Sequence, residues 1–179
     1  MSKRIRLWLI AALALCAAAA VGVTLSFMFK KAEKTTTFVP AKVTCEVKES
    51  LLSGVKRDVC VKNTGNVAAY LRIRLVSYYV YDNGNIAGRV SSQYPTLILR
   101  SGWIAGADHT YYYSTPVEPG EKTGILCDPI TLDTVELADG TPVYQVLEVF
   151  AEAIQAEPVG AVQEAWKVTV SDTRITPAP

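Results

Sequence analysis

Three of the four cysteines and the single histidine are the residues with the clearest capacity for chemistry. Cys45, Cys60 and Cys127 lie beyond an apolar N-terminal stretch, and an odd number of thiols allows at most one internal disulfide with one thiol left over. A zinc site needs closely spaced cysteines or several histidines, but no two of these cysteines have that spacing and only His109 could assist them. We therefore expect no metal site.

Cys45 and Cys60 are the obvious candidates for a disulfide, because both lie in strand-like runs joined by a short loop. Cys45 alternates in phase with Val43 and Val47, whereas Cys60 is out of phase with its neighbours Val59 and Val61. If the two runs pair as strands, the two thiols point to opposite faces. We therefore predict free thiols that behave as small apolar side chains.

The motifs of common enzymes are missing from the sequence. There is no His-Glu-x-x-His helix, and a single histidine cannot supply the usual zinc ligands of a metalloprotease. Asp108 and His109 could join a serine in a hydrolase triad, but no Gly-x-Ser-x-Gly motif is present, and an exposed turn explains the pair more simply. The glycines are too scattered for a phosphate-binding loop. We expect no catalytic residue, no cofactor and no enzymatic activity.

Four aromatic residues suggest a binding surface as an alternative. Trp103, Tyr111, Tyr112 and Tyr113 lie close together in sequence, and flat rings stack well on sugars. Aromatic residues also favour β-strands and pair across them, and this structural interpretation is the stronger one. A surface module that binds carbohydrate or protein through these four residues remains the alternative function.

Period-two alternation of apolar residues predicts β-strands along most of the chain. The longest run covers residues 68–81, with Leu71, Ile73, Leu75 and Ser77 on one face and Tyr70, Arg72, Arg74 and Val76 on the other. Further strands are predicted at 43–47, 55–62, 86–90, 95–99, 102–113, 123–132 and 144–155. The clusters at residues 63–66 and 82–85 supply turns, and the second contains Asn-Gly, a strong hairpin signal.

Short strands separated by Gly, Pro and Asn turns indicate an all-β fold. The only helix candidate is residues 161–166, after Pro158 and Gly160. We predict an antiparallel two-sheet sandwich of jelly-roll type over residues 41–172, with this short helix near the C-terminus and a frayed tail at 173–179.

The N-terminal region determines the predicted compartment. Residues 7–29 carry no charge and follow Lys3, Arg4 and Arg6. They are long enough to cross a bilayer as a retained membrane helix, but their alanine-rich centre and small polar end favour a signal peptide of residues 1–26, cut between Ser26 and Phe27. A lipid-modified Cys16 is a weaker third interpretation, because Leu15 precedes it where a small residue is expected. Each interpretation places later residues outside the cytoplasm, and only this segment would contact the membrane.

The mature chain would have the size of one domain and a slightly negative charge. Three of the 18 Lys and Arg precede the apolar stretch, which leaves 15 against 17 Asp and Glu, a formal charge of −2. This balance argues against a nucleic-acid partner, which needs a basic patch. Residues 27–40 are rich in lysine and threonine, and we expect them to form a flexible arm.

Several segments together resemble the exported TasA and camelysin-like proteins of Gram-positive bacteria, which a SipW-type signal peptidase processes. The similar segments lie at residues 22–27, 61–72, 111–113 with 119–123, and 151–156 with Ala165-Trp166. Each segment is weak alone, and their order gives the resemblance its specificity. Cys45, Cys60, Cys127 and the Lys30-Lys31 pair depart from the pattern and put the details of assembly in doubt.

The resemblance implies a jelly-roll protein that is secreted or held at the cell surface and polymerises into biofilm-matrix fibres. Its partners would be further copies of itself or related surface subunits, with the signal peptidase acting during export. In such fibres the N-terminus of one subunit completes a sheet of the next. Here the donor strand would be residues 27–40, with Phe27, Phe29, Phe38 and Val39 as its apolar positions. A membrane-anchored accessory domain is a further alternative.

Overall fold

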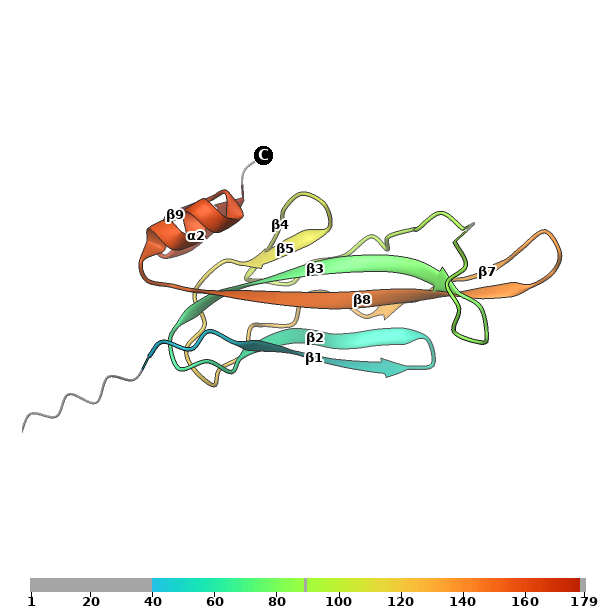
Figure 1. Cartoon of the computed structure of the whole chain (residues 1–179), viewed down its shortest axis with the longest axis horizontal. Helices are drawn as coiled ribbons and strands as arrows, with labels where there is room; N and C mark the ends of the chain where they lie inside the picture. Colours follow the sequence, from blue (N-terminus) through green and yellow to red (C-terminus); the bar gives the residue numbers. More distant parts are fainter. Residues whose placement is uncertain (1–39, 89, 178–179) are drawn as a thin grey trace, which may run out of the picture. The chain divides into compact units, whose positions relative to one another are not determined.

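The structure is a computed structural model that describes residues 40–88 and 90–177 (Figure 1). It contains ten strands and one helix: β1 (Cys45–Leu52), β2 (Val55–Asn63), β3 (Ala69–Val80), β4 (Trp103–Ala105), β5 (Thr110–Tyr113), β6 (Ile130–Thr131), β7 (Thr134–Glu136), β8 (Pro142–Gln155), α2 (Val159–Trp166), β9 (Val168–Ser171) and β10 (Arg174–Pro177). The predicted signal or membrane helix and the predicted arm up to residue 39 lie outside the described residues.

The strands form two main antiparallel sheets and a separate hairpin. One sheet has the order β1-β2-β6, the other β4-β5-β3-β8-β7, and β9 pairs with β10. In Figure 1 the long strands β3 and β8 run side by side, with β1 and β2 as a separate layer. The prediction of an all-β sandwich is confirmed, whereas its jelly-roll connectivity stays a prediction.

Strand β3 forms the centre of the core because its alternation is almost perfect. Leu71, Ile73 and Leu75 are at most 2% exposed and face the β1-β2-β6 sheet, where Val59 and Val61 of β2 pack against them. Ser77 follows on the same face, as predicted, and its hydroxyl donates a hydrogen bond to the carbonyl of Gln93. The core therefore lies between the two sheets, as expected for a sandwich.

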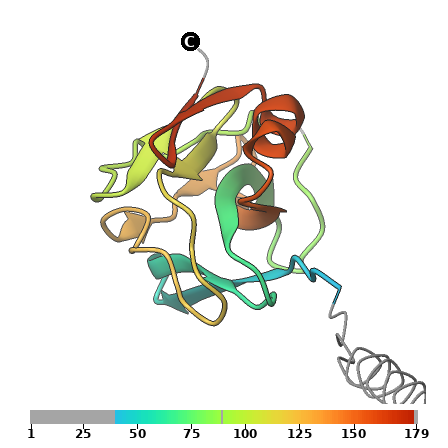
Figure 2. The same cartoon turned by 90° about the vertical axis from the view of Figure 1, so that its left-hand side faces the viewer.

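The opposite face of β3 and β8 is partly covered by α2 and the β9-β10 hairpin, which Figure 2 shows on the far side of these strands from β1 and β2. Tyr70 and Tyr112 pack there against Val162, Trp166 and Ile175. The predicted frayed tail is wrong for residues 174–177, because Ile175 is 1% exposed and the strand pairs with β9. One apolar residue in a polar run is too weak a pattern to predict a strand.

Helix α2 begins at Val159, two residues before the predicted start, and ends at Trp166. Lys167 then adopts a left-handed conformation with φ of 53°, which ends the helix and starts β9. Among the residues that the structure describes, no helix is long and apolar enough to span a membrane.

Four of the predicted strands are shorter than expected or divided. Residues 102–113 form two strands, since a turn at Asp108-His109 separates β4 from β5. Residues 95–99 and 123–132 contribute only the bridge between Leu99 and Cys127 and the two-residue β6. Pro95 and Pro129 explain the loss, because proline cannot donate to a strand ladder. Residues 86–88 add only a bridge from Ile86 to Val80.

Candidate functional site

The aromatic residues predicted as an alternative recognition face do not form one. Tyr111 and Tyr113 pack against the core between the sheets, while Tyr112 points to the opposite face and contacts Trp166 edge to face at 5.8 Å. Trp103 is 6% exposed, and its indole N–H donates to the carbonyl of Gly124 at 2.9 Å. Alternation along a strand divides these rings between two faces of the sheet, so they do not share one surface.

Asp108 and His109 form the exposed turn that the sequence predicts. Both residues have positive φ, near 50°, and the amide of Thr110 donates to the carbonyl of Ala107 across the turn. The His109 ring stacks on Tyr94 with 3.4 Å between centroids. His109 therefore fixes a loop to the β4-β5 hairpin.

The three cysteines are free thiols. Cys45 pairs with Asn63 and faces the core, whereas Cys60 pairs with Lys48 on the other face, which confirms the predicted parity. Burial raises the pKa of Cys45 above its ordinary value, with a smaller contribution from Glu152, and it raises the pKa of Cys127 to about 11. Within 40–88 and 90–177, no cluster of His, Cys, Asp and Glu could hold a metal ion.

The most distinctive feature of the described chain is a long unpaired edge on β8. Along one side, β8 pairs with β3 over its last twelve residues, from Tyr144 to Gln155. Along its other side it pairs only with β7, over Pro142 to Tyr144, extended by a hydrogen bond from the amide of Gln145 to the carbonyl of Asp133. No other described strand pairs with residues 146–155 on that side.

The direction of the backbone groups along this edge follows from two hydrogen bonds. The amide of Ala156 donates to the carbonyl of Ala68, so the backbone groups of even-numbered residues in β8 point towards β3. The amide of Gln145 donates to the carbonyl of Asp133, so the backbone groups of odd-numbered residues point away from β3. Backbone groups of successive residues alternate in direction along an antiparallel strand. The amides and carbonyls of Leu147, Val149, Ala151 and Ala153 therefore point outward. This stretch contains no proline.

A second unpaired edge lies on β1, close to the first. β1 pairs only with β2 among the described strands, and it also packs against β8. Val43 and Cys45 of this region and Ala151 and Ala153 of β8 all contact the same core. We call the side of the sandwich where these two edges meet the β1–β8 seam.

A hollow of about 430 Å³ opens at the seam between β8 and the end of the β1-β2 hairpin. It is lined by Glu49, Lys56 and residues 146–150. The Lys56 ammonium donates to a Glu49 carboxylate oxygen at 2.6 Å, and the Lys56 side chain is only 6% exposed against 33% for Glu49. Within the described part of the chain the buried ammonium has this one partner, which is costly, and it has two further hydrogens to donate.

A β-bulge explains why this lysine points inward. Between Lys48 and Ser50 the pairing register with β2 shifts by one residue, and Asp58 adopts a positive φ of 55°. The bulge reverses the side to which the preceding residues of β2 point, so the side chain of Lys56 faces the core instead of solvent. Simple alternation along β2 did not predict a buried lysine, because the bulge is visible only once β1 and β2 are paired.

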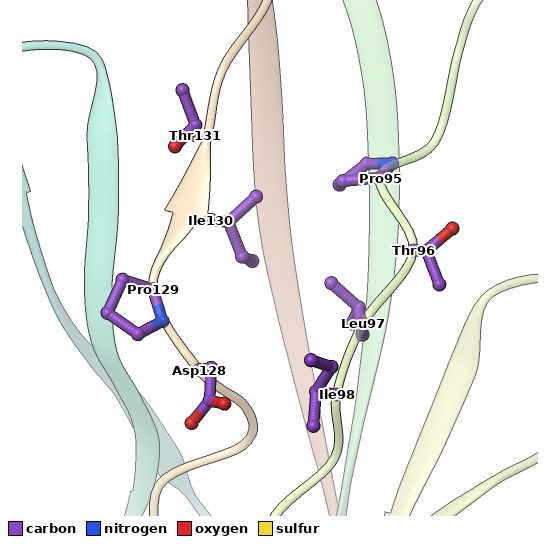
Figure 3. A pocket seen from close by; sticks show the side chains of 8 residues that line it. All are labelled: Pro95, Thr96, Leu97, Ile98, Asp128, Pro129, Ile130 and Thr131. Atoms are coloured by element: carbon purple, nitrogen blue, oxygen red, sulfur yellow. The ribbon is translucent and has the colours of Figure 1, made fainter.

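A second hollow, of about 210 Å³, separates residues 95–98 from residues 128–131 (Figure 3). The side chains of Leu97 and Ile130 point towards each other across the gap, while Thr96 points away. Asp128 at its end pairs with Arg100 at 2.9 Å. The lining of this hollow mixes apolar side chains with Thr96, Thr131 and the half-exposed Asp128, and it contains no buried charge.

The fold and seam define a class of protein, an all-β sandwich with an unpaired edge strand and an inward-facing ion pair beside it. The chain matches no protein-family model, no curated protein and no solved structure. The predicted cleavage site at Ser26 and Phe27 and the arm residues Phe27, Phe29, Phe38 and Val39 lie outside the described residues.

Proposed function

We propose that this chain is an exported structural subunit of the bacterial surface or biofilm matrix, which polymerises by accepting a strand from a neighbouring copy at the open edge of β8. The observation that carries the proposal is the ten-residue unpaired stretch, 146–155, beside the unpaired edge of β1. The uncharged segment at 7–29 and the resemblance to exported fibre proteins support it from the sequence.

An unpaired edge of this length favours association. It presents a row of amides and carbonyls that pair readily with an extended chain, and natural proteins usually cover, shorten or interrupt such an edge. Each hydrogen bond that a new strand makes contributes about 0.5–1.5 kcal/mol net, so several together stabilise a complex. Main-chain bonds supply affinity in this mode, while side-chain pockets supply specificity.

The donor in this proposal is the arm at residues 27–40. Fourteen residues in extended conformation reach about 45 Å, and the ten residues of the open edge need about 33 Å. The arm is therefore long enough to pair along the whole edge and still leave a few residues as a linker to its own domain. Removal of residues 1–26 would free this arm from the membrane, which makes cleavage the step that permits assembly.

The experiment compares two purified chains, one starting at Phe27 and one starting at Ala41. Assembly is followed by light scattering and electron microscopy at equal concentration, with circular dichroism to verify that both are folded. The proposal predicts filaments from the longer chain and monomers from the shorter one. If the chain starting at Ala41 assembles as readily as the longer one, the strand-donor function is wrong.

A further inference from the structure

We infer, on the basis of the proposed function, that the odd-numbered side chains of the arm of a second copy face into the β1–β8 seam, where Lys31 and Glu33 complete the Glu49–Lys56 ion pair. The proposal thus specifies which face of the donor strand is recognised and by which charges. It rests on the buried lysine, on the hollow beside it and on the charge pattern of the arm.

The first step concerns the unused bonding capacity of Lys56. Its ammonium can donate three hydrogen bonds, and Glu49 accepts the one that it makes within the described chain. Glu49 is partly exposed and has a second carboxylate oxygen available. The pair therefore offers one cationic and one anionic group to an incoming strand, and both lie on the wall of the same hollow.

The second step concerns the effect of a charge beside an open edge. An inward-facing charge discourages indiscriminate strand pairing, because an added apolar strand would cover the ammonium without neutralising it. A strand that carries a carboxylate at the right position avoids this penalty. Lys56 thus selects among strands, and specificity arises from the cost imposed on unsuitable partners.

The third step compares the two faces of the arm, since side chains of an extended strand alternate. The odd face carries Phe27, Phe29, Lys31 and Glu33, and Glu33 is the sole acidic residue of the arm. The even face carries Met28, Lys30, Ala32, Lys34 and Phe38, and both of its charges are positive. Only the odd face carries one ammonium and one carboxylate, which complement the carboxylate and the ammonium of the seam. Lys31 then lies beside Glu49, and Glu33 beside Lys56.

The apolar part of the arm supports the same assignment. Phe27 and Phe29 precede the charged residues on the odd face, and the hollow is also lined by Leu147 and Val149. With the odd face inward, two of the three phenylalanines of the arm are directed at the seam, and Phe38 lies on the other face. Burying such rings is among the largest favourable terms available to an added strand.

The first experiment changes the charge on each face of the arm and leaves the described domain unaltered. Lys31→Glu and Lys30→Glu make the same charge change one residue apart, in chains that start at Phe27. We expect Lys31→Glu to lower the rate of filament growth about tenfold or more, because it places a carboxylate against Glu49. Lys30→Glu should grow within about twofold of the parent, because a solvent-facing charge contributes little. Equal effects of the two substitutions would overturn the assignment of faces.

A compensating variant tests the charge pairing itself. Lys31→Glu combined with Glu49→Lys should recover growth to within about threefold of the parent, since each lysine of the seam again meets a carboxylate. Glu49→Lys alone should abolish growth, and circular dichroism shows whether this variant is folded. A folded double variant that grows no faster than Lys31→Glu contradicts the pairing.

Chemical crosslinking gives a readout that does not depend on growth rates. Carbodiimide joins contacting amines and carboxylates, so filaments of the parent chain should yield the linked pairs Lys56–Glu33 and Lys31–Glu49. With equal amounts of ¹⁴N- and ¹⁵N-labelled protein, half of these linked peptides should carry mixed labels, as expected for contacts between copies. Linked peptides without mixed labels would show that the arm fills the seam of its own chain and would overturn the second copy as partner.

The two proposals fail in different ways. If the chain starting at Ala41 forms filaments as readily as the longer chain, the strand-donor function itself is wrong. If filaments require the arm but the predicted links are absent and Lys30→Glu acts like Lys31→Glu, the strand-donor function stands and the inference about its inward face is wrong.

Discussion

Asn63 is the residue on which the loops beside β2 depend. Its side chain is completely buried, and its amide nitrogen donates to the carbonyls of Val67 and Val117 at 2.9 and 2.8 Å. Its side-chain oxygen accepts from the amide of Gly65. One buried amide group therefore bonds three backbone groups that belong to two different segments.

We predict that Asn63→Ala lowers the free energy of unfolding by about 2–4 kcal/mol, because three backbone groups each lose a hydrogen bond to this fully buried side chain. Asn63→Asp should be similarly harmful, since a carboxylate accepts hydrogen bonds but cannot donate two. Thr64 is an exposed neighbour whose hydroxyl bonds Thr44. Thr64→Ala should therefore lower the free energy of unfolding by no more than about 0.5 kcal/mol. Urea denaturation measures all three, and equal losses for Asn63 and Thr64 variants would contradict this role.

The sequence predicted the turn at this position but not the burial of Asn63. The Asn-Thr-Gly-Asn cluster is a turn signal, and Gly65 is indeed required, because a Cβ there would lie 2.2 Å from the carbonyl oxygen of Lys42. A polar residue in a turn normally faces solvent. Its burial results from Val117, more than fifty residues later, and no local pattern contains that information.

Helix α2 is held to the sheet by an arginine on β3. The Arg72 guanidinium donates to the carboxylate of Glu152 at 2.6 and 3.1 Å, and it lies 4.7 Å from the centre of the Trp166 ring. Arg72 thus links the two long strands to the only helix in the described part of the chain. A planar guanidinium can hydrogen-bond in its plane and stack on a ring at the same time.

We predict that Arg72→Lys lowers the free energy of unfolding by about 1–2 kcal/mol, because an ammonium cannot reproduce both the two-point bond and the stacking. Arg74→Lys is the matched control, since Arg74 lies two residues along the same face, is exposed, and makes no ion pair within the described residues. Arg74→Lys should lower the free energy of unfolding by no more than about 0.5 kcal/mol. Thermal unfolding followed by circular dichroism measures the stability of both variants, and tryptophan fluorescence, to which Trp103 and Trp166 both contribute, is a second probe. If Arg74→Lys destabilised the protein as much as Arg72→Lys, the role of Arg72 in holding α2 to the sheet would be contradicted.

At the level of elements, the sequence predicted the long strands well and the short ones poorly. β3 and β8 have many alternating residues, so their pattern outweighs local exceptions. β6, β7 and β10 have two to four residues each, and they exist only because a neighbouring strand is in place. The open edge of β8 was unpredictable for the same reason, because alternation shows that a strand exists but not which strands lie beside it.

Among the described residues, the open edges of β1 and β8 lie close together on one side of the sandwich, and this arrangement gives the assembly proposal its direction. A donor strand that adds to β8 uses the outward amides of odd-numbered residues, whereas the even-numbered residues already bond to β3. A proline at an odd position removes one outward donor and leaves the β3–β8 ladder intact. A proline at an even position breaks that ladder.

We therefore predict that Ala151→Pro folds but assembles poorly, because it removes an outward amide from the centre of the accepting edge. Phe150→Pro, one residue earlier, should lose about 3 kcal/mol or more of stability, because its amide faces Arg74 of β3. Thermal unfolding by circular dichroism separates the two, and light scattering measures filament growth. A stable Ala151→Pro chain that grows filaments at the parental rate would place the added strand somewhere other than β8, and the unpaired edge of β1 would be the next position to test.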